Sequence, residues 1–176
     1  MPNETLRRAL RAQTASQHRL LDDAVGSFAT VEAYGRFVAN SLAFRAPVET
    51  LLARGTRWPL LPLADLMRED LADLDVAPRP EGVFAKAPGG AGEVGIAYVL
   101  EGSALGARLL VRRAAALGYG ARYGARHLAR QVEDMARWRR FLALLETIPD
   151  SQTDAVVAGA VAAFDFALGI YTVETV

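Results

Sequence analysis

The 176-residue sequence contains no cysteine. Disulfide bonds, thiol catalysis, cysteine-ligated zinc and iron–sulfur clusters are therefore excluded together. Histidine is nearly as scarce, because only His18 and His127 are present. Two histidines argue against a multi-histidine zinc site. No glutamate stands three residues before either histidine, so the Glu-x-x-His pairs of di-iron bundles are absent as well.

The chain also lacks an excess of charge of one sign. Twenty basic residues balance twenty acidic ones, so no overall field attracts nucleic acid or an anionic membrane. No apolar run approaches about eighteen residues without a charged or polar break. The beginning, "MPNETLRRAL", has the pattern of an amphipathic helix and not of a signal-peptide core. We therefore expect a cytoplasmic protein that binds neither membrane nor nucleic acid.

Apolar residues at helical spacing dominate what is present. The chain is 52% hydrophobic and 23% charged, and no convincing run of strands occurs. This pattern predicts an all-α, bundle-like single domain over residues 1–176. The expected helices span approximately residues 4–25, 31–54, 63–74, 91–117, 126–147 and 153–176.

Proline, glycine and polar residues set the expected limits of these helices. Pro47 should kink the second helix, and Pro149 should stop the fifth. The segment "DVAPRPEGVFAKAPGG", residues 75–90, is rich in proline and glycine and is the longest expected loop. The segment "DSQTD" is expected to cap the last helix.

Three glycines interrupt the fourth expected helix, although each costs about 0.5–1 kcal/mol relative to alanine. Gly95, Gly102 and Gly106 are separated by seven and four residues, which places them on one face, with Ser103 and Ala107 beside it. The face therefore lacks bulk. Either another helix packs closely there, or a flat ligand lies across the exposed backbone.

His18 has polar neighbours at helical spacing. Arg11, Thr14, His18 and Asp22 follow at intervals of three or four residues and share a face of the first helix. An imidazole one turn before a carboxylate can be an iron ligand that the carboxylate orients. Alternatively, it is a surface or core histidine paired with Asp22. His127 is expected to be a solvated or capping side chain without a chemical role.

At this point three segments resemble the haem oxygenase family. "QTASQHRLLD" is similar to its first-helix pattern, T-x-x-x-H-x-x-x-[DE]. "YVLEGSALGARLL" resembles the bacterial form of its distal helix, Y-x-x-E-G-S-x-L-G-[GA], and "RWRRFLALLE" resembles its later Trp-x-x-Phe helix. The resemblance spans most of the chain, in the family's order. It implies a haem-oxygenase-like bundle with a ligand slot between the first helix and the glycine-bearing distal helix.

The resemblance implies roles for particular residues. His18 would be the proximal ligand and bind iron through Nε2, with Asp22 as the partner of its other nitrogen. Gly102 and Gly106 would let the distal helix kink over the haem and would contact bound dioxygen. Ser103 stands where many members carry an aspartate that organises distal water, which leaves the water network open.

The haem propionates need cationic partners, and arginine binds carboxylates bidentately. Arg11 lies two turns before His18 and matches a basic position of the family. Arg137, Arg139 and Arg140 compete for the second role, and we assign it to Arg139.

The implied reaction is the oxidative cleavage of haem to biliverdin, carbon monoxide and ferrous iron, with O2 and external electrons. Haem would be both cofactor and substrate. A ferredoxin or flavoprotein reductase is the expected electron donor, because the chain has no cysteine and no nucleotide motif. Two alternatives stay open. One is a non-catalytic haem-binding protein (carrier, store or sensor) on the same fold, and the other is a helical protein whose glycines only pack helices.

Overall fold

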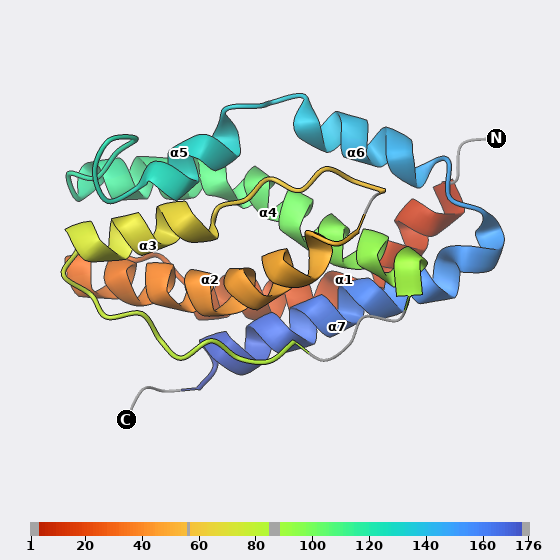
Figure 1. The fold of residues 1–176 in the computed structure, drawn as a ribbon, viewed down its shortest axis with the longest axis horizontal. Coiled ribbons are helices and arrows are strands. Elements are labelled where there is room, and N and C mark those ends of the chain that lie inside the picture. Colours follow the sequence, from red (N-terminus) through yellow and green to blue (C-terminus); the bar gives the residue numbers. More distant parts are fainter. Residues whose placement is uncertain (1–3, 56, 85–88, 174–176) are drawn as a thin grey trace.

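The computed structural model describes residues 4–55, 57–84 and 89–173. Within these residues the chain is helical and contains no strand beyond isolated bridges near Gly120. The predicted all-α architecture is confirmed. The elements are α1 Glu4–Val25, α2 Val31–Leu52, α3 Ala64–Asp73, α4 Gly89–Ala116, α5 Arg126–Val132, α6 Arg137–Leu145, a 3₁₀ turn Asp150–Gln152, and α7 Thr153–Tyr171 (Figure 1).

Local signals define several helix ends as predicted. α1 stops before Gly26, which adopts a left-handed φ of +60° that glycine tolerates best. Thr30 caps α2, because its hydroxyl accepts a hydrogen bond of 3.2 Å from the Ala33 amide. α2 continues through Pro47 to Leu52. Of the predicted loop, residues 75–84 have no regular secondary structure, and 85–88 lie outside the described residues.

The single helix predicted for residues 126–147 is wrong, because the structure divides it into α5 and α6. The break lies at Asp134, whose carboxylate accepts a hydrogen bond of 3.1 Å from the Ala136 amide. This local side-chain turn competes with the helical hydrogen-bond ladder. Arg140 then pairs with the same carboxylate and lowers the pKa of Asp134. The interruption lets α5 and α6 follow different directions along α4 (Figure 1).

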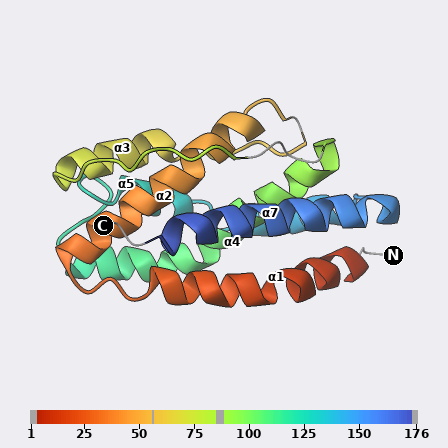
Figure 2. The same ribbon diagram turned by 90° about the horizontal axis from the view of Figure 1, so that it is seen from below.

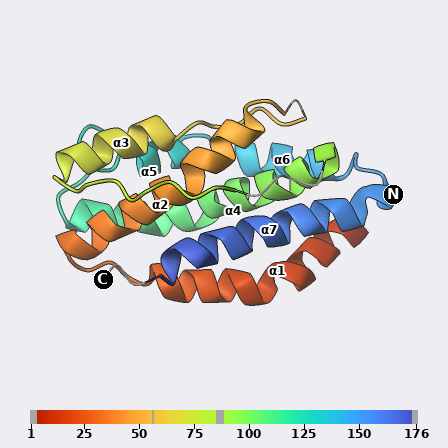
Figure 3. The same cartoon turned by 60° about the horizontal axis from the view of Figure 1, so that its bottom comes forward.

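The helices form a bundle in which α7 packs against both α1 and α4 (Figure 2). α3 lies along α2 on the other side of the molecule, and α5 packs on both α3 and α4 (Figure 3). One buried apolar cluster joins α1, α4, α6, α7 and the end of α2, and a second joins the rest of α2, α3, α5 and the end of α4. α4 therefore contributes to both cores, which fixes it relative to α1.

Two helical segments, Gly89–Ala116 and Asp150–Tyr171, are long and apolar enough to cross a membrane by length and composition alone. The sequence does not show them as uninterrupted apolar runs, because each contains a few charged or polar residues. Both belong to the bundle, where α4 and α7 pack on each other. Less than half of each apolar window is buried in the bundle.

Candidate functional site

His18 and Asp22 form a pair on the exposed side of α1. The distance between Nδ1 of His18 and Oδ2 of Asp22 is 3.0 Å, and the two side chains are 62% and 69% exposed. The imidazole also contacts the buried ring of Phe164 in α7 edge-on, with ring centroids 5.9 Å apart. Within the described part of the chain, nothing bonds Nε2 of His18. The ring is thus oriented by a carboxylate, and its second nitrogen is available to a ligand.

Arginine side chains relate α1 to α4 on either side of His18 along the chain. Burial raises the pKa of Tyr98 in α4, and the positive charges of Arg11 and Arg7 in α1 act against that rise. Fifteen residues further along each helix, the Arg113 guanidinium of α4 donates a hydrogen bond of 3.0 Å to the carbonyl oxygen of Gly26. α1 and α4 therefore run in the same direction, and each packs against α7.

Counting residues along the two helices puts the predicted glycines at about the same level as His18. His18 lies about midway between Arg11 and Gly26 on α1, and helices rise by the same amount per residue. The matching part of α4, about midway between Tyr98 and Arg113, contains Gly102 and Gly106.

The glycine strip of α4, formed by Gly95, Gly102 and Gly106, has two parts with different surroundings. A Cβ atom at Gly95 would lie 1.8 Å from the carbonyl oxygen of Val156, so the lack of a side chain at Gly95 allows α4 to pack closely on α7. A Cβ at Gly102 would meet only the Trp138 ring, at 3.8 Å, and one at Gly106 would meet nothing within 4 Å. Both alternatives of the sequence analysis therefore occur in one helix. α4 remains a continuous α-helix through Gly102 and Gly106.

Ser103 directs its hydroxyl away from this open face. Its Oγ donates to the Leu100 carbonyl oxygen at 2.6 Å and accepts a hydrogen bond of 2.7 Å from the Gln131 side chain of α5. Ser103 thus follows Gly102 in the sequence, but its side chain contacts α5.

The three candidate arginines of α6 differ in their partners. Arg137 binds Glu101, and Arg140 binds Asp134. Arg139 is exposed and, among the residues that the structure describes, makes no hydrogen bond or ion pair. Of the three, only its guanidinium is available for an anionic ligand.

His127 is not the solvated or capping side chain that was predicted. It is 1% exposed, its Nδ1 lies 2.7 Å from Oδ2 of Asp70, and its Nε2 is buried without a partner. Asp70 of α3 also accepts the backbone amides of Arg126 and His127, and so caps α5 from a distant segment. Burial lowers the pKa of His127, although the Asp70 carboxylate opposes this. Asp70 lies 57 residues away, so no local sequence signal reveals the pair.

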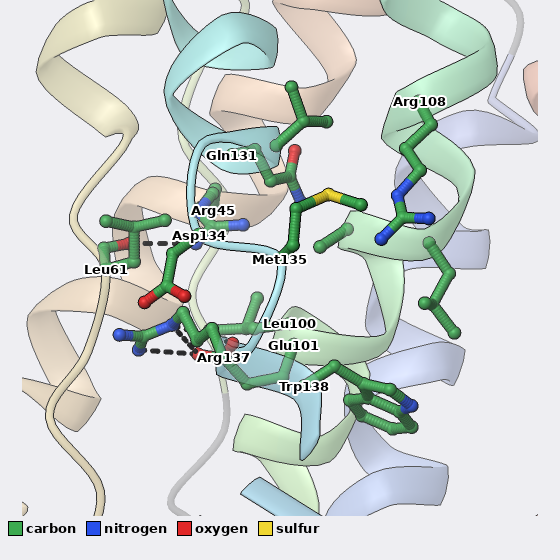
Figure 4. A pocket seen from close by; sticks show the side chains of 13 residues that line it. Arg45, Leu61, Leu100, Glu101, Arg108, Gln131, Asp134, Met135, Arg137 and Trp138 are labelled. Carbon is green, nitrogen blue, oxygen red and sulfur yellow. Dashed lines mark hydrogen bonds and ion pairs between the residues drawn. The ribbon is translucent and has the colours of Figure 1, made fainter. Parts of the chain in front are cut away.

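Sequence reasoning missed a set of polar contacts between α4, α6 and the loop before α3. Glu101, 5% exposed, receives hydrogen bonds from Arg137 and Trp58. Glu101 and Arg137, but not Trp58, line a pocket that opens to solvent between α4 and the α5–α6 segment (Figure 4). None of the residues lining the pocket comes from α1 or α7, so it lies on the other side of α4 from His18. Glu101 is the one acidic residue between Glu93 and Glu133.

No group of three or more His, Asp or Glu side chains that could hold a metal ion occurs within residues 4–55, 57–84 and 89–173. A ligand that brings its own metal-binding atoms, such as a macrocycle, needs only one protein ligand. The single available nitrogen of His18 meets that requirement.

Comparisons with known proteins agree on one family. The chain is 36% identical over 162 residues to heme oxygenase PigA of Pseudomonas aeruginosa, covering 82% of each protein. It is 35% identical over 113 residues to a heme oxygenase of Xanthomonas campestris pv. campestris, covering 62% of this chain and 67% of the relative. The crystal structure of the NO- and CO-bound heme oxygenase from Neisseria meningitidis matches with a TM-score of 0.77 and 27% identity, covering 94% of this chain and 89% of the other. No protein-family model matches the sequence.

Proposed function

The chain belongs to the bacterial haem oxygenase family, and from this premise we propose that it cleaves haem oxidatively to biliverdin, carbon monoxide and ferrous iron. The observation that carries the proposal is the open backbone at Gly102 and Gly106 of α4, and we assign the His18 imidazole of α1 to the other face of the haem. One helix offers a nitrogen ligand, and the other offers backbone without side chains.

The residues at this site fit haem. His18 presents an unbonded Nε2, while the Asp22 carboxylate holds its Nδ1 and so fixes the tautomer and the direction of the ring. The open space at Gly106 leaves room for a flat ring close to the helix, where a side chain of any size would intrude. Phe164 supplies an apolar surface beside the imidazole. Bound haem supplies both the iron that activates O2 and the ring that is opened.

The remaining residues act by positioning the substrate. Arg11 lies on the His18 side of α1, and Arg139 on α6 has no competing partner. Both are proposed to bind the propionates, because guanidinium groups bind carboxylates bidentately. The rotation of the ring between α1 and α4 then determines which meso carbon faces the reacting oxygen. No protein nucleophile is needed for this role.

O2 and a separate electron donor complete the proposal. With no cysteine in the sequence, the chain has no thiolate to hold an iron–sulfur cluster or to form a redox disulfide. We therefore assign the electrons to a ferredoxin or flavoprotein reductase. A cytoplasmic location is part of the same proposal, supported by the packing of α4 on α7, and cell fractionation would test it.

Turnover in the presence of a reductant tests the function directly. The purified protein is titrated with haem and then supplied with O2 and either ascorbate or a ferredoxin–reductase pair. We expect a stoichiometric complex, followed by loss of its Soret band and growth of a biliverdin spectrum. A complex that stays ferrous without ring opening would instead indicate a carrier, store or sensor. If the protein does not bind haem, the proposal is contradicted.

A further inference from the structure

Glu101 immediately precedes Gly102 on α4 and is held by several donors at once. Nε of Arg137 donates to both carboxylate oxygens, at 3.0 Å and 2.8 Å, and Nη2 adds a bond of 2.7 Å (Figure 4). The indole Nε1 of Trp58 donates to Oε1 at 2.8 Å. The carboxylate therefore has little freedom to move, and neither does the turn of α4 that carries it.

The partners of Glu101 are themselves fixed. Arg137 is the first residue of α6, its Nη2 also donates to the Pro59 carbonyl oxygen, and its guanidinium lies 5.1 Å from the Trp58 ring centroid. Three segments of the chain thus meet at this carboxylate, namely α4, α6 and the loop before α3.

The contact continues to the open glycine. Trp138, the next residue of α6, is the neighbour that a Cβ at Gly102 would meet, at 3.8 Å. The same ring contacts Tyr98, one turn earlier on α4, with centroids 5.7 Å apart. Consecutive residues of α6 therefore bind α4 directly before Gly102 and beside it.

Stability alone does not account for this arrangement. Both side chains of the ion pair are largely buried, at 6% exposure for Glu101 and 15% for Arg137. Two buried charges cost solvation free energy, and apolar residues of similar size often stabilise a fold as well or better. What a bidentate pair provides is a fixed geometry.

We propose that Glu101 is a positioning residue: its ion pair with Arg137 and its bond from Trp58 fix the backbone at Gly102 relative to His18. In this way it sets which part of the haem ring faces the reacting oxygen. The inference rests on the proposed function, since it assigns Gly102 to the face that haem occupies. Glu101 does not touch the substrate and acts through the helix.

Four variants of the full chain test this assignment. Glu101→Gln removes the charge but keeps the shape, and Trp58→Phe removes one donor while keeping a ring against Arg137. Glu101→Gln combined with Arg137→Gln leaves no unpaired buried charge. Arg130→Gln is the matched control, because Arg130 forms only an exposed pair with Glu133 in the same α5–α6 segment.

Two readouts are measured on the haem complexes: the distribution of biliverdin isomers, and the C–O stretching frequency of the ferrous carbon monoxide complex. Small displacements of groups that position a substrate can lower rates by about a hundredfold. For Glu101→Gln we expect a changed distribution of biliverdin isomers and a shifted C–O frequency. Turnover should be about tenfold slower, and the affinity for haem should change little. The double variant should resemble the single one, because the pair acts as a unit.

The outcomes separate this inference from the proposed function. Wild-type isomers and C–O frequency in folded Glu101→Gln or Trp58→Phe protein would overturn the positioning role. If Glu101→Gln does not fold, Trp58→Phe and the double variant decide by the same two measurements. If the wild-type protein binds haem without degrading it, the proposed function fails, and the C–O frequency alone decides whether Glu101 positions the helix. An altered Arg130→Gln control would also count against the assignment.

Discussion

Gly95 of α4 meets the backbone of Val156 in α7 so closely that a Cβ on Gly95 would lie 1.8 Å from the Val156 carbonyl oxygen. Gly106, eleven residues further along the same side of α4, faces open space. Two glycines of one sequence strip therefore serve different purposes. Gly95 permits helix packing, and Gly106 leaves a face of backbone uncovered.

Alanine substitutions separate these purposes. Gly95→Ala should lower the free energy of unfolding by about 3 kcal/mol, because the helices must move apart. Gly106→Ala should raise it by about 0.5 kcal/mol, because alanine favours the helix and meets no atom. Urea unfolding of the protein without haem measures both. Equal effects of the two substitutions would contradict the division of the strip.

The activity of Gly106→Ala should change in the opposite direction to its stability. The added methyl group lies on the face assigned to haem, so we expect slower turnover or weaker haem binding in a protein that folds at least as well. Haem titration and biliverdin formation measure this. A stabilised variant with wild-type turnover would mean that the ring lies elsewhere.

His18→Ala should abolish the spectrum of histidine-ligated haem, because Nε2 of His18 is the proposed iron ligand. Absorption and resonance Raman spectra of the ferric and ferrous complexes report this ligand directly. His127→Asn is the matched control, since His127 is buried away from α1 and paired with Asp70. An unchanged spectrum in His18→Ala would assign the ligand to another group.

Asp22→Asn tests the orientation of the proximal imidazole. The variant keeps a hydrogen-bonding side chain near Nδ1 but removes the charge that makes the ligand more basic. Partners of metal-bound histidines typically contribute about 10- to 100-fold to affinity or activity. We expect a loss at the lower end, because the pair is well exposed. The iron–histidine stretching frequency should fall, and a constant value would show that Asp22 has no influence on the bond.

Arg139→Gln should change the isomers of biliverdin more than the rate of their formation. The reason is that a lost propionate contact allows the ring to rotate between α1 and α4. Arg11→Gln should act in the same direction from the other helix. Arg140→Gln, which breaks only the exposed pair with Asp134, should leave the isomers unchanged. Chromatography of the products distinguishes these variants, and an effect confined to Arg140→Gln would reassign the contact.

The buried pair of His127 and Asp70 predicts a pH dependence of stability. Burial lowers the pKa of His127 in the folded protein below the value of about 6.5 in the unfolded chain. Between these two pKa values the unfolded state therefore binds more protons than the folded state. The free energy of unfolding consequently falls as the pH decreases from about 6.5, by up to about 1.4 kcal/mol per pH unit. Above about pH 7 the imidazole is neutral in both states, and the full stability is present.

His127→Asn should remove this dependence. The asparagine amide can replace Nδ1 as a donor to Asp70 but does not titrate. Thermal or urea unfolding of both proteins between about pH 5 and 7 measures the difference, and His18 is common to both. A wild-type protein that becomes more stable on acidification would reverse the assigned direction.

Interactions within one or two turns of a helix were predictable from the sequence. The pairing of His18 with Asp22 follows from a spacing of four residues, and the end of α1 follows from Gly26. Thr30 likewise indicates the start of α2. The break at Asp134 is also local, but an aspartate inside an amphipathic pattern resembles an ordinary exposed helix residue, so the pattern predicted a single helix.

The sequence by itself therefore determined most of the helices, the face that carries His18, and the lack of side chains along part of α4. Only the tertiary structure decided that Gly95 is covered by α7 while Gly106 is open, and that Ser103 turns toward Gln131. It also decided that His127 is buried and that Glu101 is bound from α6. The physical reason is range: helical periodicity says which residues share a face, whereas what covers that face depends on segments that are far away along the chain.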